Sequence, residues 1–278
     1  ASGNLRLTRD AVRERESLLR AAPGLVEPQG FAFADHGTDV KRRLGLLAML
    51  RVYDMLAGRR EPHRERPESF RMLAQNTGEA NLAGGIRYTD AKTDDARLVL
   101  RVLDEARAHG AVACNYVTVQ ALVRDGGKVH GAMLRDERSK AETAVRARGG
   151  INATGAWSAR LGELAGVPLP VVPGRRQIGF TPQASPPFPT VPFTLDLSTT
   201  LYFHNYPGGM LLGISNADEP EGFGRDFDDA WVPAFEDAAR IVAPGLIGRP
   251  LEGGWAGLYE NTPDHNAIIG VSRQLDGF

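Results

Sequence analysis

The sequence predicts a mixed α/β (α+β) fold, in which part of an α/β domain is interleaved with an antiparallel-sheet domain. Three observations support this class. Residues 151–158 have the pattern of a strand that ends in a tight turn and then a helix. Residues 95–147 have the pattern of a helix followed by several short strands. From Pro168 onward, prolines and turn residues separate short apolar runs, which is typical of strands.

The composition is that of an ordinary globular protein. The chain has 278 residues, of which 42% are hydrophobic and 24% charged, and its formal net charge is −1. A charge so close to zero predicts no general affinity for nucleic acid. Cys114 is the only cysteine, so no disulfide can form within the chain. We find no signal-peptide pattern and no membrane-length apolar run, and we expect a cytoplasmic location.

Two helices are predicted in the first third of the chain. The first covers Leu5–Ala21 and ends at Pro23-Gly24. The second covers Leu44–Ala57 and has basic residues on both sides, which leaves a peripheral membrane contact as one interpretation. We favour a helix that packs on the protein, because Arg51 and Asp54 interrupt its apolar surface.

A charged loop is predicted over Arg59–Arg71, and the clearest helix over Asp95–His109. We expect Leu98, Val102 and Leu103 to form the buried stripe of that helix. A βαβ unit and meander should follow, with strands at 111–116, 117–124, 128–135 and 142–147.

The stretch Ile151–Ser158 organises the prediction. An apolar strand should end at Ala153, a tight turn should lie at Thr154-Gly155, and a helix should open near Ser158. Glycine at such a turn allows the backbone to approach a bound group closely. Spacing alone favours an ordinary βα turn, and Gly149-Gly150 should weaken the strand before it.

The second half predicts an antiparallel sheet with helices on one side. Gly208-Gly209 has the pattern of a hairpin turn, and a helix is expected over Trp231–Val242. The candidate strands are Arg176–Thr181, Leu201–His204, Met210–Ile214, Gly253–Tyr259 and Ala267–Ile269.

Three stretches resemble FAD-dependent oxidoreductases of the D-amino-acid oxidase superfamily. The stretch Gly85–Leu98 resembles FAD-dependent glycerol-3-phosphate dehydrogenase. The stretches Ala153–Ser158 and Gly253–Asn266 resemble the branch of sarcosine oxidase, dimethylglycine dehydrogenase and amino-acid dehydrogenases. The resemblance implies a Rossmann-like FAD-binding domain interleaved with the substrate domain, and FAD as cofactor.

The resemblance also implies a division of the chain into four parts. These are a helical connecting or cap region at 1–93, part of the FAD domain at 94–166, the substrate domain at 167–260, and a return to the FAD domain at 261–278. No G-x-G-x-x-G pattern follows a strand, so we expect an incomplete enzyme that binds FAD weakly or not at all by itself.

The resemblance implies a set of flavin-binding residues, with the backbone of Val119 near the adenine. The implied residues are Val119, Ala153, Thr154, Gly155, Trp157, Gly257 and Asp264. For Asp264 we favour an ordinary role in turn geometry. The six histidines are scattered, so we expect no metal site.

Candidate substrate residues lie in the second half. Arg175 or Arg176 can hold a carboxylate or phosphate, and Arg176 is favoured because it lies deeper in its strand. Tyr202 and His204 share one strand face, and Tyr259 lies in the other matching stretch. The side chain of His265 is a candidate proton acceptor and therefore a candidate catalytic residue. Arg176 is the other candidate catalytic residue. The alternative for His204 is a buried histidine with a purely structural role. The alternative for Arg175 and Arg176 is that one of them forms a surface ion pair and the other is solvated.

The predicted function is transfer of a hydride to flavin from a C–H bond next to nitrogen or oxygen of a small substrate. The second half favours an amine, amino acid or imino acid, and the first half keeps glycerol 3-phosphate as an alternative. The electron acceptor is open among oxygen, a quinone and a carrier protein. A non-catalytic module unable to bind flavin is the alternative of another class.

Overall fold

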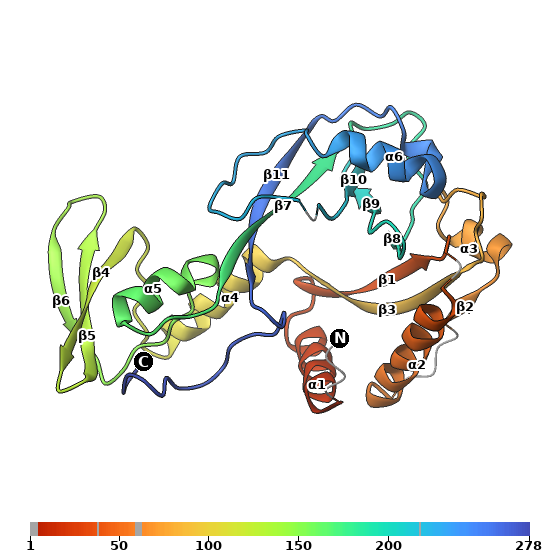
Figure 1. Cartoon of the computed structure of the whole chain (residues 1–278). Coiled ribbons are helices and arrows are strands. Elements are labelled where there is room, and N and C mark those ends of the chain that lie inside the picture. Colours follow the sequence, from red (N-terminus) through yellow and green to blue (C-terminus); the bar gives the residue numbers. More distant parts are fainter. Residues whose placement is uncertain (1–4, 38, 59–62, 217) are drawn as a thin grey trace. The chain divides into compact units, whose positions relative to one another are not determined.

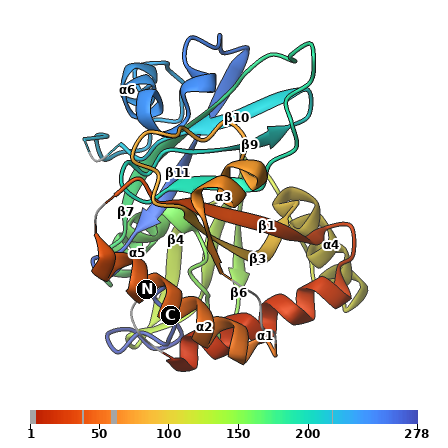
Figure 2. The same cartoon turned by 90° about the vertical axis from the view of Figure 1, so that its right-hand side faces the viewer.

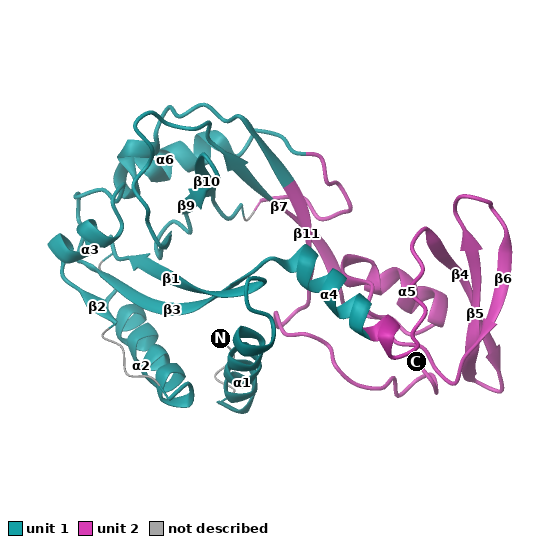
Figure 3. Cartoon of the chain, turned by 180° about the vertical axis from the view of Figure 1, so that it is seen from behind, with its two compact units in different colours: residues 1–105, 177–216, 227–255 teal, residues 106–176, 217–226, 256–278 magenta. Residues whose placement is uncertain are grey.

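The computed structural model describes residues 5–37, 39–58, 63–216 and 218–278 (Figure 1). They form two compact units, coloured separately in Figure 3. The large unit contains residues 1–105, 177–216 and 227–255. The small unit contains residues 106–176, 217–226 and 256–278. Strands β7 and β11 contribute residues to both units.

An eight-stranded sheet dominates the large unit. Its strand order is β11-β7-β10-β9-β8-β1-β3-β2. The strands are β1 (Val26–Ala34), β2 (Arg64–Glu65), β3 (Gly85–Thr93), β7 (Val172–Phe180), β8 (Phe193–Asp196), β9 (Tyr202–Tyr206), β10 (Gly209–Gly213) and β11 (Gly253–Asn261). Strand β1 pairs antiparallel with β3 but parallel with β8, so the whole sheet is mixed. Within residues 167–260, the pairs β8–β9, β9–β10 and β10–β7 are antiparallel, as expected.

Helix α6 (Val232–Val242) covers one face of this sheet, as Figure 2 shows. Residues at alternate positions of β9 and β10 point into this core, which is the period-two pattern of a strand with one buried face. The main members are Leu201, Phe203, Met210, Leu212, Trp231 and Phe235. The hairpin between β9 and β10 turns at Gly208, whose φ is +92°, and confirms the predicted turn.

A second cluster lies where helix α3 (Pro67–Leu73) meets β1 and β3. Phe70 is fully buried with Ala32 and Ala34. Gly85 has no room for a side chain, because a Cβ there would lie 2.0 Å from the Phe70 ring. The charged-loop prediction was therefore wrong at β2 (Arg64–Glu65) and from residue 67 onward, and residues 59–62 lie outside the described part. Region 1–93, which we predicted to be helical, therefore also contains strands β1 and β3.

Helices α1 (Leu5–Ala21) and α2 (Val40–Leu56) confirm the two predicted helices. In α2, Leu50 and Asp54 are buried, whereas Leu44 and Met55 are exposed. No helix among the described residues is both long and apolar enough to cross a membrane. A peripheral membrane contact stays a prediction.

The small unit holds a three-stranded meander, which the sequence predicted. It consists of β4 (Val117–Asp125), β5 (Lys128–Asp136) and β6 (Glu142–Arg146). Helix α5 (Ser158–Ala165) packs through Ala165 against Val129 and Val167. Helix α4 (Asp95–Ala108) begins in the large unit and ends in the small one.

Several expected features are absent from the described residues. No strand forms at 111–116, 149–153 or 267–269. Only single backbone hydrogen bonds form there: Gly150 donates to the Gly277 carbonyl and Glu137 to the Tyr116 carbonyl, each at 2.8 Å. Ile151 and Ile269 are 94% and 92% exposed. The buried stripe expected on α4 was wrong, because Val102 and Leu103 are exposed and Leu98 is only half-buried.

Candidate functional site

Tyr202 and His204 lie on the face of the large sheet opposite the α6 core. Their register with β8 and β10 confirms that they share this face. Both rings pack on Phe193, with centroid distances of 5.4 Å for Tyr202 and 5.3 Å for His204. Gly213 makes room for Tyr202, because a Cβ at Gly213 would lie 2.3 Å from that ring.

The ring contacts continue across the neighbouring strands. Phe31 lies 5.2 Å from Phe193 and 5.1 Å from Tyr88, and Phe33 lies 5.4 Å from Tyr88. We call the set Phe31, Phe33, Tyr88, Phe193, Tyr202 and His204 the aromatic face. The sequence analysis missed the first four of these residues, because β1, β3 and β8 were not recognised as strands.

The aromatic face is electrically neutral. Burial lowers the pKa of His204, so its imidazole is neutral near pH 7, and its Nδ1 lies 2.8 Å from the Asn205 carbonyl oxygen. Burial also raises the pKa of the Tyr88 hydroxyl. Such a surface suits an apolar or uncharged part of a ligand, with the tyrosine and histidine available for hydrogen bonds.

A polar network joins helices α1 and α2 to strand β3. Arg15 donates to the Tyr53 hydroxyl at 2.6 Å, and that hydroxyl donates to Asp90 at 3.0 Å. Burial and the Asp90 charge raise the pKa of Tyr53 to about 12. Arg15 also forms ion pairs with Glu16 and Asp90. This cation is therefore already neutralised.

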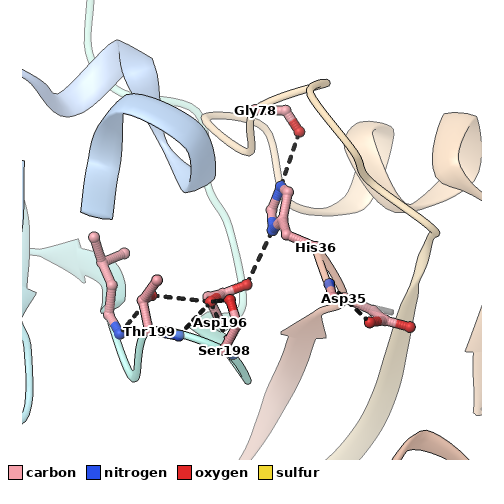
Figure 4. Close-up of polar contacts among 8 residues, drawn as sticks. Asp35, His36, Gly78, Asp196, Ser198 and Thr199 are labelled. Atoms are coloured by element: carbon pink, nitrogen blue, oxygen red, sulfur yellow. Dashed lines mark hydrogen bonds and ion pairs between the residues drawn. The ribbon is translucent and has the colours of Figure 1, made fainter. Parts of the chain in front are cut away.

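The sequence analysis also missed a buried ion pair between His36 and Asp196 (Figure 4). Nδ1 of His36 lies 2.9 Å from Asp196 Oδ1, and Nε2 lies 3.2 Å from the Gly78 carbonyl oxygen. Both neighbours are acceptors, so both ring nitrogens can donate only when the imidazole is protonated. No local pattern could reveal this contact, because 160 residues separate the partners.

The pKa values of this pair agree with its geometry. Burial alone lowers the pKa of His36, but the hydrogen bond to Asp196, the Gly78 carbonyl and nearby carboxylates outweigh it and raise the pKa. Burial alone raises the pKa of Asp196, but bonds from His36, Ser198 and Thr199 lower it to about 2. The pair clamps the end of β1 to the loop at Gly78 and to the turn after β8.

Arg175 and Arg176 differ in their contacts within the small unit. Arg175 forms an ion pair with Glu219, and its Nη1 donates to the Asp226 carbonyl at 2.8 Å. The Arg176 guanidinium lies 5.6 Å from the Tyr259 ring centroid, and its Nη1 donates to the Arg175 carbonyl at 2.8 Å. Arg176 has no acidic partner within the described part of the chain, so its charge remains available.

The turn at 152–158 is held by Asn152. The Asn152 side-chain amide donates to the Ser158 carbonyl at 3.0 Å, while its oxygen accepts from the Thr154 hydroxyl at 2.8 Å. Gly155 has a φ of +54°, and a Cβ there would meet nothing within 4 Å. Trp157 packs on Phe223 in the same unit. The predicted turn and helix start are present, and Ala153 and Thr154 are exposed.

An apolar cavity of about 230 Å³ lies beside the meander. Val119, Gly149, Gly150, Ile151 and Leu161 are among its lining residues. The two glycines leave the wall flat, which suits a planar apolar group. Val119, predicted from the resemblance, therefore lines a cavity within the small unit.

The remaining candidates lie on or after β11. Gly257 is half-buried and Tyr259 is exposed. Asp264 accepts from the Asn266 backbone N–H at 3.2 Å and from Thr262 Oγ1 at 3.3 Å. Bonds from Asn266 lower the pKa of this carboxylate, so it has the turn role that we favoured.

His265 is exposed in the same turn, with a φ of +56°. It has no orienting carboxylate bond in the described structure, and its catalytic role stays a prediction. No group of three metal-ligating side chains occurs among the described residues.

Comparison with known proteins places the chain among flavoenzymes. The model of the family described as FAD dependent oxidoreductase (DAO) matches residues 2–278. Glycerol-3-phosphate dehydrogenase of Mycobacterium leprae is 38% identical over 160 residues, which are 55% of this chain and 26% of that protein. The chain therefore spans about a quarter of the length of this relative.

Solved structures give the same fold. L-proline dehydrogenase from P. horikoshii superimposes with a TM-score of 0.81 at 17% identity, covering 100% of this chain and 72% of that one. Glycerol-3-phosphate dehydrogenase from Bacillus halodurans, solved with FAD, has a TM-score of 0.64 at 23% identity, covering 93% and 47%.

Proposed function

The chain belongs to the FAD-dependent oxidoreductase (DAO) family, and from this premise we propose that it acts in the oxidation of a small amine, amino acid or imino acid. The reaction removes a hydride from a carbon next to the substrate nitrogen. The observation that carries the proposed substrate class is the neutral aromatic face of the large sheet.

The residues present fit part of an FAD site. The flat apolar cavity beside Val119 and Gly150 would hold the adenine, and the preformed turn at Thr154-Gly155 would approach the cofactor with its backbone. When bound, the flavin supplies the acceptor for the hydride. Trp157, Gly257 and Asp264 stay further candidates for cofactor contact.

The chain's own residues bind and orient the substrate. The rings of the aromatic face exclude water from the apolar part of the substrate. The neutral imidazole of His204 and the hydroxyl of Tyr202 are candidate hydrogen-bonding groups beside it. In the small unit, Arg176 has no acidic partner among the described residues, and it stays a candidate for binding a carboxylate. Tyr259, which lies under its guanidinium, would orient it.

The charges near the aromatic face favour a nitrogen substrate over a phosphate. A phosphate dianion needs more than one unpaired cation or several N–H donors. Near the aromatic face, Arg15 is paired with Glu16 and Asp90, and Lys92 is paired with Glu27 at 3.4 Å. Glycerol 3-phosphate remains the second candidate because of the 38% identity with the mycobacterial dehydrogenase.

The test is a substrate panel on the full-length protein. We expect that it purifies with FAD, and that amino and imino acids bleach the flavin in the absence of oxygen. A protein that folds but never binds FAD would instead be the non-catalytic module. Reoxidation by oxygen, a quinone or a carrier protein then identifies the acceptor, and cell fractionation tests the proposed cytoplasmic location.

A further inference from the structure

The large unit contains a cavity of about 560 Å³, whose lining shares no residue with the aromatic face or with Arg176. Its volume lies within the range of roughly 300–1,000 Å³ that is typical of small-molecule sites. One wall is the segment 181–189 after β7, and the others are Asn76, Gly245, Arg249 and Pro250. The four prolines of that segment give a stiff, apolar wall.

Arg249 supplies a positive charge at this cavity. Its guanidinium carbon lies 5.1 Å from the Phe188 ring centroid, and its Nε donates to the Gly245 carbonyl at 3.2 Å. These contacts orient the side chain and leave the terminal nitrogens as donors. The structure gives Arg249 no carboxylate partner among the residues that it describes.

Asn76, which is far from Arg249 in the sequence, supplies a second hydrogen-bond donor. Its side-chain Nδ2 is buried and has no hydrogen-bond partner in the described structure. Leaving a buried amide N–H without an acceptor is unfavourable, so this group calls for an acceptor atom. Asn76 lies in the wall of the cavity, and a ligand acceptor there would require this amide to turn toward it.

The position of Asn76 is fixed by the backbone that follows it. Gly78 donates to the Val242 carbonyl at 2.7 Å, and a Cβ on Gly78 would lie 1.9 Å from the Ile241 carbonyl oxygen. The loop is therefore held against the end of α6, next to Gly245. This close approach preorganises the Asn76 amide at the cavity.

We propose that this cavity binds a small organic anion that has an apolar, planar part. The carboxylate or phosphate would accept from Arg249 and Asn76, and the apolar part would lie against Phe188 and the prolines. The site is distinct in its residues from the aromatic face and from Arg176, and it does not depend on the proposed substrate.

Phenyl phosphate and benzoate are the probes, with phenol as the neutral control, in calorimetric titrations of the full-length protein. We expect saturable binding of at least one anion, at least tenfold tighter than phenol. Whichever of the two anions binds more tightly shows whether the site prefers a phosphate or a carboxylate. Arg249→Met should weaken that binding at least tenfold and Asn76→Ala several-fold.

Arg240→Met is the matched control, because Arg240 is a paired surface arginine on α6 and should leave binding unchanged. Circular dichroism confirms the fold of each variant. The proposal is overturned if neither anion saturates the protein, or if Arg249→Met binds them as tightly as the wild type.

Discussion

Gly155 combines a φ of +54° with open space at its Cβ position. We predict that Gly155→Val lowers the FAD content of the full-length protein at least tenfold, because the side chain blocks backbone approach to the cofactor. Gly24→Val is the matched control, since Gly24 also has a positive φ, +80°, and open space. Both variants bear similar backbone strain. Equal flavin content in the two variants would show that Gly155 is an ordinary turn residue with no role in cofactor binding.

The His36–Asp196 pair predicts a pH dependence of stability. The raised pKa of His36 gives a contribution that is complete below its unfolded value of about 6.5 and is lost as pH rises through the folded pKa. The lowered pKa of Asp196 gives one that is present above about 4 and is lost as pH falls toward 2. The pair therefore stabilises most between about pH 4 and 6.5.

The measurement is urea unfolding of wild type and His36→Gln from about pH 4 to about pH 9. The difference in unfolding free energy should shrink from about pH 6 to about pH 9. The exposed residue His109 provides the control variant His109→Gln, whose difference from wild type should not change over that interval. A His36→Gln difference that stays constant with pH would show that the imidazole does not titrate as described.

Arg176 is the residue that we propose as the main determinant of specificity. Arg176→Ala should lower kcat/KM for a carboxylate-bearing substrate by about 2 kcal/mol, which is the loss of a charge-assisted hydrogen bond. Arg176→Lys should recover only part, because an ammonium lacks the planar fork of donors. Arg175 serves as the comparison, since its ion pair with Glu219 predicts a loss of stability rather than of specificity. Wild-type kinetics in Arg176→Ala would remove it from the site.

At the scale of elements, the β9–β10 hairpin positions the aromatic face. Gly213→Ala places a methyl group 2.3 Å from the Tyr202 ring, so we predict a displaced ring and a stability loss of about 1–3 kcal/mol. The KM for substrate should also rise. Gly30→Ala in the same sheet is the control, because its Cβ would meet only Pro192, at an ordinary 3.5 Å. Unchanged KM in a folded Gly213→Ala variant would argue against a substrate role for this face.

Local patterns predicted the elements that carry strong periodicity or clear breakers. Helix α1 ends at Pro23-Gly24 and the hairpin turns at Gly208-Gly209, as expected. Strands β1 and β3 were missed because their partners are distant in sequence, and strand pairing depends on those partners. The segments 111–116 and 149–153 show the opposite error, because we predicted strands there and none forms. In the described structure Tyr116 and Gly150 bond only singly to neighbouring backbone, at Glu137 and Gly277, and no ladder forms.

The same limit applies to the candidate site. The shared face of Tyr202 and His204 follows from alternation along one strand and could be predicted. Their contacts with Phe193, and the contact of Phe193 with Phe31, depend on the order of strands in the sheet, which local sequence does not encode. The different roles of Arg175 and Arg176 are set by Glu219, more than 40 residues away. The likeness to known families supplied the flavin interpretation.

For the whole molecule, we predict that residues 1–278 alone bind FAD weakly or not at all. The chain contains the cavity that we propose for the adenine and the Thr154-Gly155 turn, but no G-x-G-x-x-G loop for the pyrophosphate. Equilibrium dialysis of the purified chain against FAD measures this. Stoichiometric FAD that survives dialysis would contradict the prediction.

The central claim is that this flavoprotein oxidises a carbon next to nitrogen, and single-turnover flavin reduction tests it most directly. The flavin-loaded full-length protein is mixed without oxygen with L-proline, glycine or sarcosine, and separately with glycerol 3-phosphate. The account predicts that at least one nitrogen substrate bleaches the flavin faster than glycerol 3-phosphate does at equal concentration. Rapid bleaching by glycerol 3-phosphate, with none by the nitrogen substrates, would contradict it.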